Sequence, residues 1–557
     1  MIPAPSVQGR GPLAARIMIV AEFTTADDLW KSTPLGGRMG DFFGKLLHEA
    51  GIIRAECYIT NVCKFRPKGD TVDHLYSQTK STAQKTGLTE VIGGTWVHPS
   101  VPPMFEVLSN EVREVGPTVI IALGDFSMFA LTHVYGSCDT WRGSHLNFIY
   151  SEEPLPPITV IPTYPPAMIM KKWELKGFCT RDLQRAKDIE RHPEYYNYPA
   201  YNFLIRPTFL QAKETLLGLL AIPLSGKPLP LSIDIETIAR HLSCIGLAWN
   251  CREAICIPFM SLDGHYWTEE EEIELSFLLK ALLTHPLTEG IGQNFAYDTQ
   301  YFARYLGYMP KLSFDTMIAQ HVLFPGIPKR LDFLSSMYCH WHRYWKDEMN
   351  DYSRLPENME QYWTYNCKDV VVTFEVSIVL RELLEHLQRT PQYDFVHETA
   401  NSALRAMLKG MRIDAKTRSE TAGRLLEAIS EYDALIQDIV GFPLNVGSPQ
   451  QMANFFYGEL GLPVQIDRKT KRPTLNAKAL VVLVQKEPLI KQLVELIDKK
   501  RSLGVFLSTF CLMPLDEDGR MRCSFNVCGT ESLRLSSSQN AFGRGGNLQN
   551  LPKGTEE

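Results

Sequence analysis

The spacing of hydrophobic and polar positions changes along the chain and divides it into three parts. Residues 1–190 alternate short hydrophobic runs such as PTVIIALG (117–124) with amphipathic stretches such as DFFGKLLHEAG (41–51). Residues 206–385 show a similar mixture. Residues 386–557 place most hydrophobic residues at helical spacing and end in a short strand and loops rich in Gly, Ser and Asn. The pattern predicts an α/β multidomain protein whose third part is mainly α-helical.

The expected domain boundaries follow from a break between the first two parts. Residues 191–205 are polar, rich in tyrosine and interrupted by proline, which is typical of a linker. We therefore expect domains at 1–190 and 206–385, followed by a third region at 386–557. CHWH (339–342) crowds possible metal donors together, and we interpret it as a half-buried aromatic loop.

The composition narrows the class of protein. The chain has 557 residues, of which 45% are hydrophobic and 22% charged, as is ordinary for a globular protein with several cores. The formal net charge of −6 excludes a basic footprint over the whole chain, so any contact with nucleic acid must be local. The cysteines form no CxxC pair, and we see neither a membrane-spanning hydrophobic run nor a signal-peptide pattern. These features predict a cytoplasmic location.

Two carboxylates interrupt the strand pattern of LSIDIETI (231–238). Because side chains alternate along a strand, Asp234 and Glu236 lie on one face, opposite the larger hydrophobic residues. About 7 Å apart at an effective dielectric constant near 20, they would repel each other by about 2 kcal/mol. We therefore expect a cation beside them, or open access to water.

Two later segments place polar and acidic groups at helical spacing. Asn294 and Asp298, in GIGQNFAYDTQYFARYLG, are four residues apart and would share a face if both were helical. Tyr365 and Asp369, in YNCKDVVVTFEV, repeat this spacing. Two divalent cations held by such carboxylates suit phosphodiester hydrolysis, and a nearby phenol can orient the attacking water.

Each of these motifs also has an ordinary interpretation. A D-x-E pair in a strand is commonly a solvated face. Asn294 could be a helix N-cap, with Asp298 favourably placed in the first turns of the helix dipole. The ordered combination of the three motifs is more specific than any one of them.

The order D-x-E, N-x3-D and Y-x3-D resembles the DEDDy family of 3′–5′ exonucleases. FDTMIAQHVLFPGIPKRLDFLSSMY (314–338) resembles the stretch between that family's second and third motifs. The resemblance implies an RNase H-like fold and two Mg²⁺ or Mn²⁺ ions. It also implies that Tyr365 aligns the attacking water and that Asn294 contacts DNA. The metal ligands that it implies are Asp234, Glu236, Asp298 and Asp369.

The segment GTESLRLSSSQNAFGRGGNLQNLP (529–552) resembles the signature of family A DNA polymerases, and LNVGSPQQMANFFYGELGLP (444–463) resembles their thumb. Ser532 and Leu533 stand where that family has Thr and Gly, and AFGRGG replaces a short link. A polar edge strand and turn is the alternative interpretation. The resemblance implies contacts to phosphates, sugars and minor-groove edges that do not read sequence. The residues implied in these contacts are Arg534, Ser536, Ser537, Asn547, Gln549 and Asn550.

Nucleotidyl transfer in this polymerase family needs two palm aspartates and a fingers helix, which follow the signature. The sequence given ends at GTEE. We therefore expect that the chain by itself does not polymerise DNA. It would be a truncated form, an incomplete reading, or one half of a split enzyme whose second chain carries the palm and fingers.

Three segments of the first part resemble the uracil-DNA glycosylase superfamily, especially its iron–sulfur branch: AEFTTADDLWKSTPLGGRMGDFF, YITNVCKFRP and TVIIALG. Glu22 matches an acidic residue after the first strand and Asn61 lies in the matching N-V-x3-R-P segment, although turns and a strand-end cap would also explain these residues. Pro165 stands where that family has the histidine that polarises the uracil carbonyl, and the cluster cysteines have no counterparts. We expect a glycosylase-like fold with lost or greatly weakened activity and no iron–sulfur cluster. The fold would be retained for holding DNA, a partner or the polymerase body.

Together the resemblances predict the N-terminal part of a phage-type family A DNA polymerase that proofreads DNA during replication in the host cytoplasm. Its partners would be primer–template DNA, a single-stranded 3′ end and replisome proteins. Three alternatives stay open: a stand-alone DEDDy nuclease acting on RNA or DNA, a non-catalytic DNA-binding or assembly subunit, and an active uracil-DNA glycosylase. The signature argues against the first, the intact carboxylates against the second for the middle part, and Pro165 against the third.

Overall fold

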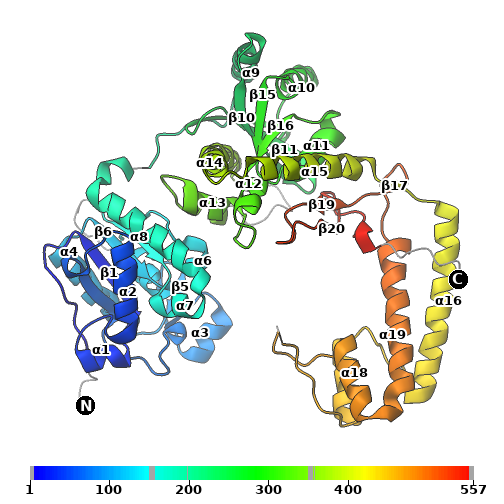
Figure 1. Ribbon diagram of the computed structural model, residues 1–557, viewed down its shortest axis with the longest axis horizontal. Coiled ribbons are helices and arrows are strands. Elements are labelled where there is room, and N and C mark those ends of the chain that lie inside the picture. The colour runs from blue at the N-terminus through cyan, green and yellow to red at the C-terminus, as the bar shows by residue number, and fades with distance from the viewer. Residues whose placement is uncertain are drawn as a thin grey trace. The chain divides into compact units, whose positions relative to one another are not determined.

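The computed structural model describes residues 6–149, 157–196, 198–348, 356, 358–468 and 470–550. Its elements form an α/β N-terminal domain, an α/β middle domain and a mainly helical C-terminal region, so the expected α/β multidomain fold is confirmed (Figure 1). The chain divides into two compact units. The first contains Met1–Phe295 and Tyr308–Thr390, and the second contains Ala296–Gly307 and Pro391–Glu557. The N-terminal and middle domains therefore share one unit.

The N-terminal domain is built on a five-stranded sheet in the order β2-β1-β6-β8-β7. Neighbouring strands are parallel except β7, which runs antiparallel to β8. The hydrophobic runs in the sequence form β1 and β6, which are buried on both faces as parallel strands covered by helices usually are. The strands are β1 (Ile17–Phe23), β2 (Tyr58–Cys63), β6 (Val119–Leu123), β7 (Leu146–Asn147) and β8 (Thr159–Thr163), beside a small sheet of β3 (Tyr76–Ser77), β4 (Glu90–Ile92) and β5 (Thr95–Val97).

Helices cover this sheet, and one core joins them to it. Met18 of β1 and Ile120 of β6 lie in the same hydrophobic core as Phe105, Phe126 and Phe129 from the helices. The helices are α1 (Ala26–Lys31), α2 (Gly37–Glu49), α3 (Lys80–Thr86), α4 (Val101–Val115), α5 (Asp125–Thr132), α6 (Cys138–Trp141), α7 (Pro166–Lys171) and α8 (Lys176–Arg191).

The middle domain is built on a six-stranded sheet in the order β16-β15-β10-β11-β12-β9. β10 runs antiparallel to β11 and parallel to β15, and its pairing register with β11 shifts between Glu236 and Thr237. The strands are β9 (Asn202–Leu204), β10 (Leu229–Ile238), β11 (His241–Ala248), β12 (Glu253–Pro258), β15 (Thr288–Gly292) and β16 (Leu312–Asp315), with a hairpin of β13 (Met260–Ser261) and β14 (Gly264–His265).

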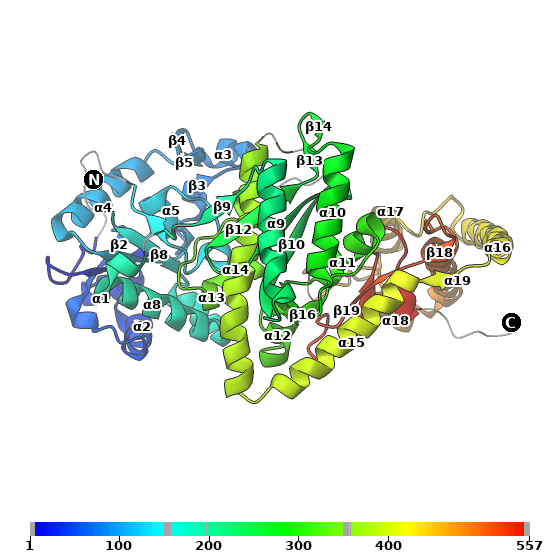
Figure 2. The same ribbon diagram turned by 90° about the horizontal axis from the view of Figure 1, so that it is seen from above.

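A long helix, α14, packs against β10, β11 and β12, whereas α9 and α10 pack against each other (Figure 2). The side chain of Asn358 caps the start of α14 by accepting a hydrogen bond from the backbone of Gln361, which fixes where this helix begins. The helices that follow β9 in this unit are α9 (Phe209–Leu224), α10 (Glu269–Leu283), α12 (Thr316–Leu323), α13 (Leu331–Tyr338) and α14 (Met359–His386).

The segment predicted to be a linker is partly structured. α8 ends at Arg191, and β9 pairs in parallel with β12 as an edge strand of the middle sheet. The stretch that joins the two domains therefore contributes a strand to the second of them. The predicted boundaries at 190, 206 and 386 stay predictions.

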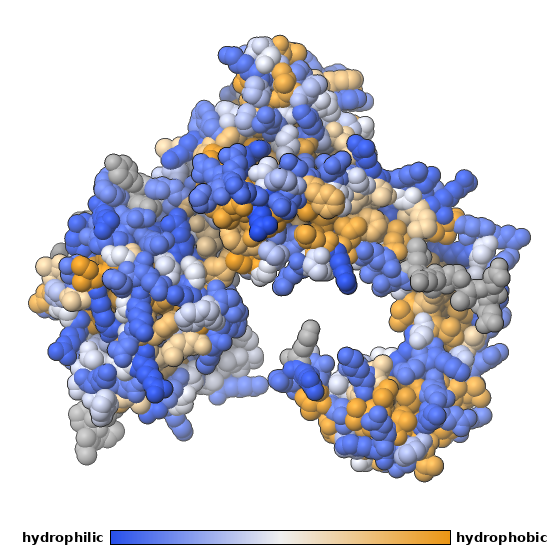
Figure 3. Space-filling model, viewed as in Figure 1, coloured by the Kyte–Doolittle hydropathy of each residue, from blue (hydrophilic) through white to orange (hydrophobic). Residues whose placement is uncertain are grey.

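The second unit contains long helices and short hairpins. α16 and α19 lie side by side (Figure 1), and a hydrophobic core joins α16, α18 and α19. Hydrophobic residues also gather on the surface of the lobe that contains α18 (Figure 3), where Leu460, Val481 and Leu489 are exposed. The elements are α11 (Ala296–Tyr301), α15 (Thr390–Lys409), α16 (Ala415–Val440), α17 (Pro449–Ala453), α18 (Ala477–Lys486), α19 (Lys491–Phe506) and the strand pairs β17 (Met411–Arg412) with β18 (Arg520–Met521) and β19 (Ser524–Asn526) with β20 (Ser536–Ser538). Among the described helices, none has the length and hydrophobicity needed to cross a membrane.

Candidate functional site

Three of the predicted metal ligands meet between a strand and a helix of the middle domain. Asp234 and Glu236 lie on the same face of β10, as strand alternation predicts, and Asp369 reaches them from α14. Each of the three offers a carboxylate oxygen, and these oxygens lie within 4.8 Å of one another. Such a group of hard oxygen ligands fits a divalent cation.

An amide on α14 holds the first of these carboxylates. Asn366 Nδ2 donates a hydrogen bond of 3.0 Å to Asp234 Oδ2. Gly246, directly opposite Asp234 on β11, leaves the space that this amide needs. A Cβ atom at position 246 would lie only 2.4 Å from Asn366 Oδ1. The glycine and the asparagine therefore act together to place Asp234.

A segment between α13 and α14 contacts the third carboxylate and the tyrosine. Trp345 Nε1 donates to Asp369 Oδ1 at 2.7 Å. Lys346 Nζ donates to Tyr365 OH at 2.7 Å and also to Asp369 Oδ2. Both oxygens of Asp369 and the phenol of Tyr365 are therefore held by two neighbouring residues.

The pKa values show how strongly these charges act on one another. Burial, and then the nearby charge of Asp369, raises the pKa of Asp234 to about 8, while Lys346 and the Asn366 amide oppose this rise. Burial and the same neighbouring carboxylates raise the pKa of Glu236 well above its ordinary value. Burial lowers the pKa of Lys346, but the carboxylates outweigh it and raise that pKa to about 12. Without a bound cation, Asp234 and Glu236 thus keep protons at pH values at which free carboxylates are ionised, because one ammonium group only partly offsets burial and mutual repulsion.

The motif at 294–298 is arranged differently from the expectation. Asn294 has a left-handed backbone (φ 56°) and lies outside α11, which begins at Ala296, so the condition for a helical face shared with Asp298 is not met. The backbone N–H groups of Asn294 and Phe295 instead donate to Asp315, at 3.2 and 2.9 Å. Asp298 is buried on α11 and is not one of the three clustered carboxylates.

Residues of the C-terminal signature fold back on one another. Ser536 and Ser537 lie on β20, and Ser537 Oγ donates to Asn547 Oδ1. Gln549 Nε2 donates to the backbone oxygen of Leu535 at 2.9 Å. Arg534 and Asn550 are exposed. The matching residues therefore form one small hairpin with a returning loop.

Leu533 occupies a backbone conformation that favours glycine. Its φ is 59°, in the left-handed region, which costs a residue with a Cβ atom about 1–2 kcal/mol. The polymerase signature has Gly at this position. The hairpin therefore holds Leu533 in a conformation that glycine, the residue of the signature, would adopt without strain.

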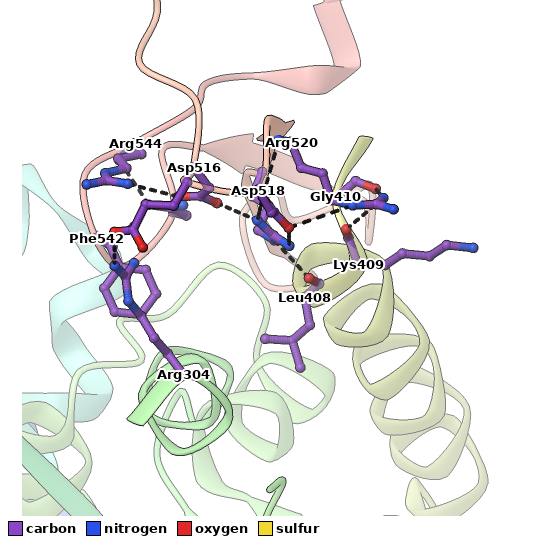
Figure 4. Close-up of polar contacts among 12 residues, drawn as sticks. Arg304, Leu408, Lys409, Gly410, Asp516, Asp518, Arg520, Phe542 and Arg544 are labelled. Atoms are coloured by element: carbon purple, nitrogen blue, oxygen red, sulfur yellow. Dashed lines mark hydrogen bonds and ion pairs between the residues drawn. The ribbon is translucent and has the colours of Figure 1, made fainter. Parts of the chain in front are cut away.

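Arginine side chains tie this region to the end of α15 (Figure 4). Arg522 pairs with Asp516 and Asp518 and donates to the backbone oxygen of Leu408 at 2.8 Å. Arg304 stacks on the ring of Phe542, with 4.4 Å between the guanidinium carbon and the ring centroid. A cavity of about 340 Å³ lies among these side chains. The contacts explain how the second unit holds its hairpins in place.

The three positions singled out in the N-terminal domain lie at the carboxyl ends of parallel strands. Glu22 is near the end of β1, Asn61 near the end of β2, and Pro165 follows β8. Glu22 Oε1 accepts from the backbone of Phe126 at 2.9 Å, and burial raises the pKa of Glu22 to about 7. Asn61 is fully buried and donates to Thr24 Oγ1 at 3.1 Å. All three residues thus lie at the end of the sheet where the parallel strands have their carboxyl ends. Ligands of open α/β sheets commonly bind at this end.

Sequence reasoning missed Trp345, Lys346 and Asn366. Asn366 follows Tyr365 directly, and its position three residues before Asp369 on one helix was a usable signal. Trp345 and Lys346 lie in a segment without helical or strand periodicity, so only tertiary contacts reveal them.

Three family models match the chain: the uracil DNA glycosylase superfamily over residues 8–186, the 3′–5′ exonuclease over residues 211–385, and DNA polymerase family A over residues 415–557. The chain therefore contains segments similar to each of these three families. The three resemblances seen in the sequence are thereby confirmed, and the clustered carboxylates lie in the segment that matches the exonuclease family.

Two curated relatives of the chain are bacterial DNA polymerases. DNA polymerase I of Rhizobium leguminosarum is 26% identical over 288 residues, which cover 50% of this chain and 28% of that protein. DNA polymerase I of Synechocystis sp. is 24% identical over 348 residues, which cover 58% of this chain and 33% of that protein. The chain therefore spans about a third of the length of these relatives.

A solved structure is also similar to part of the chain. It is the POL domain of Pol1 from M. smegmatis in complex with DNA primer-template and dNTP, at 19% sequence identity and a TM-score of 0.45. The match covers 61% of this chain and 55% of that one.

Proposed function

We propose that the exonuclease domain removes nucleotides from the 3′ end of DNA, as the proofreading part of a phage-type family A DNA polymerase. The observation that carries this proposal is the group formed by Asp234, Glu236 and Asp369, with Tyr365 held beside it, inside the segment that matches the exonuclease family. Buried carboxylates with raised pKa values are expected where a site must bind cations and not only fold.

The three clustered carboxylates, Asp234, Glu236 and Asp369, fit a divalent cation, and we propose that together with Asp298 they hold two Mg²⁺ or Mn²⁺ ions. When bound, such ions supply charge stabilisation to the attacking and leaving oxygens of an in-line displacement. Tyr365 would orient the attacking water through its hydroxyl group, and Asn366 keeps Asp234 aimed at the site. Asn294 would contact the single-stranded DNA end.

The other two segments would hold DNA. In the polymerase segment, Arg534, Ser536, Ser537, Asn547, Gln549 and Asn550 would contact template–primer phosphates and sugars. In the glycosylase-like domain, Pro165 has no side-chain donor, so we propose that base excision is lost or greatly weakened. We place the domains at 1–190, 206–385 and 386–557, and the protein in the host cytoplasm with replisome proteins as partners.

The test is degradation of a 5′-labelled single-stranded oligonucleotide with Mg²⁺, with and without a chelator. We expect shortening from the 3′ end by the wild type, and a loss of at least roughly a hundredfold in rate for Asp234→Asn and for Asp369→Asn. Asp263→Asn, at an exposed carboxylate of the same domain, serves as the matched control and should keep the wild-type rate. Equal rates in all four proteins, or none in the wild type, would contradict the proposal.

The alternatives predict other results. A stand-alone nuclease would degrade RNA at least as fast as DNA in the same assay. A non-catalytic subunit would bind the oligonucleotide without shortening it. An active glycosylase would leave alkali-labile sites in a uracil-containing oligonucleotide, and we expect none.

A further inference from the structure

The segment Cys339–Glu348, here called the strap, links two places that the sequence gives no reason to connect. Near its end, Trp345 and Lys346 bind Asp369 and Tyr365 of the carboxylate cluster. The preceding residues of the strap pack on the glycosylase-like domain. One short segment therefore contacts both a neighbouring domain and the exonuclease centre.

Hydrogen bonds to backbone groups of the strap, at Cys339, His342 and Tyr344, fix it to the glycosylase-like domain. Arg185 Nη2 donates to the oxygen of Cys339 at 2.9 Å. The backbone N–H of His145 donates to the oxygen of His342 at 2.7 Å. The backbone N–H of Tyr344 donates to Ser144 Oγ at 3.1 Å. These bonds hold the strap at three successive points.

Side chains seal the same contact. The ring of Tyr344 meets that of Trp141 edge-on, with 5.2 Å between their centroids, and packs against the core of the glycosylase-like domain. Arg142, which is buried and paired with Asp182, donates to Ser336 Oγ at 2.7 Å just before the strap. Buried charges and hydrogen bonds of this kind are costly to rearrange, so the contact is a fixed one.

The chain between Tyr344 and Lys346 is too short for one of these residues to move independently of the other. Tyr344 and Lys346 are two residues apart, and a chain of this length spans at most about 7 Å. A shift of Tyr344 on the glycosylase-like domain must therefore move Lys346 relative to Asp369 and Tyr365. The side chain of Lys346 keeps 26% of its surface exposed, so it has room to leave the cluster.

We propose that Lys346 is a positioning residue of the exonuclease centre, and that the glycosylase-like domain sets its position through the strap. This inference rests on the proposed exonuclease function. The ammonium group of Lys346 holds the Asp369 carboxylate and the Tyr365 hydroxyl group in place, and it competes with a divalent cation for the same cluster. The glycosylase-like domain thereby influences the rate of proofreading through the strap, and it does not itself catalyse a step.

The first experiment measures Mn²⁺ binding to the full chain without DNA, by electron paramagnetic resonance, beside the single-turnover rate of 3′ nucleotide removal. Lys346→Met should bind Mn²⁺ at least fivefold more tightly, because the competing charge is gone. It should also remove nucleotides at least tenfold more slowly at saturating Mn²⁺, because Tyr365 is no longer held. Lys346→Arg should recover part of the rate.

Lys280→Met, at an exposed lysine of α10, is the matched control and should behave as the wild type. Unchanged Mn²⁺ affinity in Lys346→Met, or an unchanged rate, overturns the role given to Lys346. A merely structural role would lower affinity and rate together.

The second experiment tests the coupling. Tyr344→Ala should shift Mn²⁺ affinity in the same direction as Lys346→Met, and in the Lys346→Met background it should have no further effect beyond twofold. Ser144→Ala, which removes one hydrogen bond from the other side of the contact, should produce a smaller shift of the same sign. Trp30→Ala, at a tryptophan that is 82% exposed on the glycosylase-like domain, is the control.

Additive effects of Tyr344→Ala and Lys346→Met, or wild-type affinity in both Tyr344→Ala and Ser144→Ala, would overturn the coupling. Circular dichroism identifies a variant that does not fold, and Ser144→Ala then decides the question. Asp234→Asn separates the two proposals. If it leaves Mn²⁺ binding and nucleotide removal intact, the exonuclease assignment itself fails. If it abolishes both while the Lys346 and Tyr344 variants match the wild type, only the strap inference fails.

Discussion

Asn366 on α14 donates a hydrogen bond of 3.0 Å to the carboxylate of Asp234 on β10, across 132 residues of sequence. Gly246 makes this contact possible because any side chain there would collide with the amide. Gly246→Ala should therefore slow nucleotide removal about tenfold, as expected when a group that orients a metal ligand is displaced. It should also lower the free energy of unfolding by about 1–3 kcal/mol.

The matched control for this change is Gly218→Ala in α9. Nothing lies within 4 Å of a Cβ atom there, so the added methyl group should raise stability by about 0.5–1 kcal/mol and leave the rate unchanged. Rate assays and urea denaturation of both variants make the comparison. A full rate in Gly246→Ala would show that Asn366 does not orient Asp234.

The pH dependence of metal binding follows from Asp234. Its raised pKa means that the folded protein keeps a proton that the unfolded chain has already lost, so in metal-free protein this group reduces stability as pH rises from about 4 to about 8. Divalent cations bind the ionised carboxylate. Mn²⁺ affinity should therefore rise by up to about tenfold per pH unit between about pH 6 and pH 8 and then level off.

Titrations of Mn²⁺ at four pH values across this window, with Asp234→Asn as the comparison, check this prediction. The variant has no ionisable group at position 234 and should bind weakly with a shallower slope. A wild-type affinity that is independent of pH would mean that the carboxylate is already ionised in the folded protein.

The left-handed backbone of Leu533 makes a simple stability prediction. Leu533→Gly should raise the free energy of unfolding of the polymerase segment by about 1 kcal/mol, because glycine adopts this conformation without strain and Leu533 is 52% exposed. Leu533→Ala should give no gain, since alanine also carries a Cβ atom. Urea denaturation of the three proteins distinguishes these outcomes, and equal gains from both variants would rule out backbone strain as the cause.

The buried ion pair of Arg142 and Asp182 should matter far more than an exposed one. Arg142→Met leaves the buried carboxylate of Asp182 without its partner and should cost about 3–5 kcal/mol. Arg66→Met breaks the exposed pair with Asp70 and should cost less than about 1 kcal/mol. Urea denaturation followed by tryptophan fluorescence compares them. A further Asp182→Asn change should recover part of the loss, and additive losses would argue against the pairing.

The hydrophobic pattern of the sequence predicted the strands and side-chain directions that depend mainly on residues close together in the chain. β1 and β6 follow directly from hydrophobic runs, and the alternation along β10 places Asp234 and Glu236 on one face. β9 was not predicted from the sequence, because this three-residue strand is stabilised by pairing with β12 and has no strand pattern of its own.

The residues of the candidate site also divide into those that the sequence predicts and those that only the structure reveals. Spacing along the chain singled out Asp369 and Tyr365, but it could not show that Asn294 has a left-handed backbone and lies outside the helix. Lys346 could not be found from the sequence, because its place beside Asp369 depends on how the strap is held by a separate domain. The order of the motifs thus predicts which types of residue form the cluster. Tertiary contacts determine which other residues lie around it.

The edge strand β9 has a practical consequence for dissecting this protein. A fragment that starts at residue 206 would lack Asn202–Leu204 and would leave the outer hydrogen-bonding groups of β12 without their partner strand. Unpaired sheet edges invite other chains to add to them. An isolated fragment of the middle domain should therefore begin before residue 202 if it is to remain monomeric in solution.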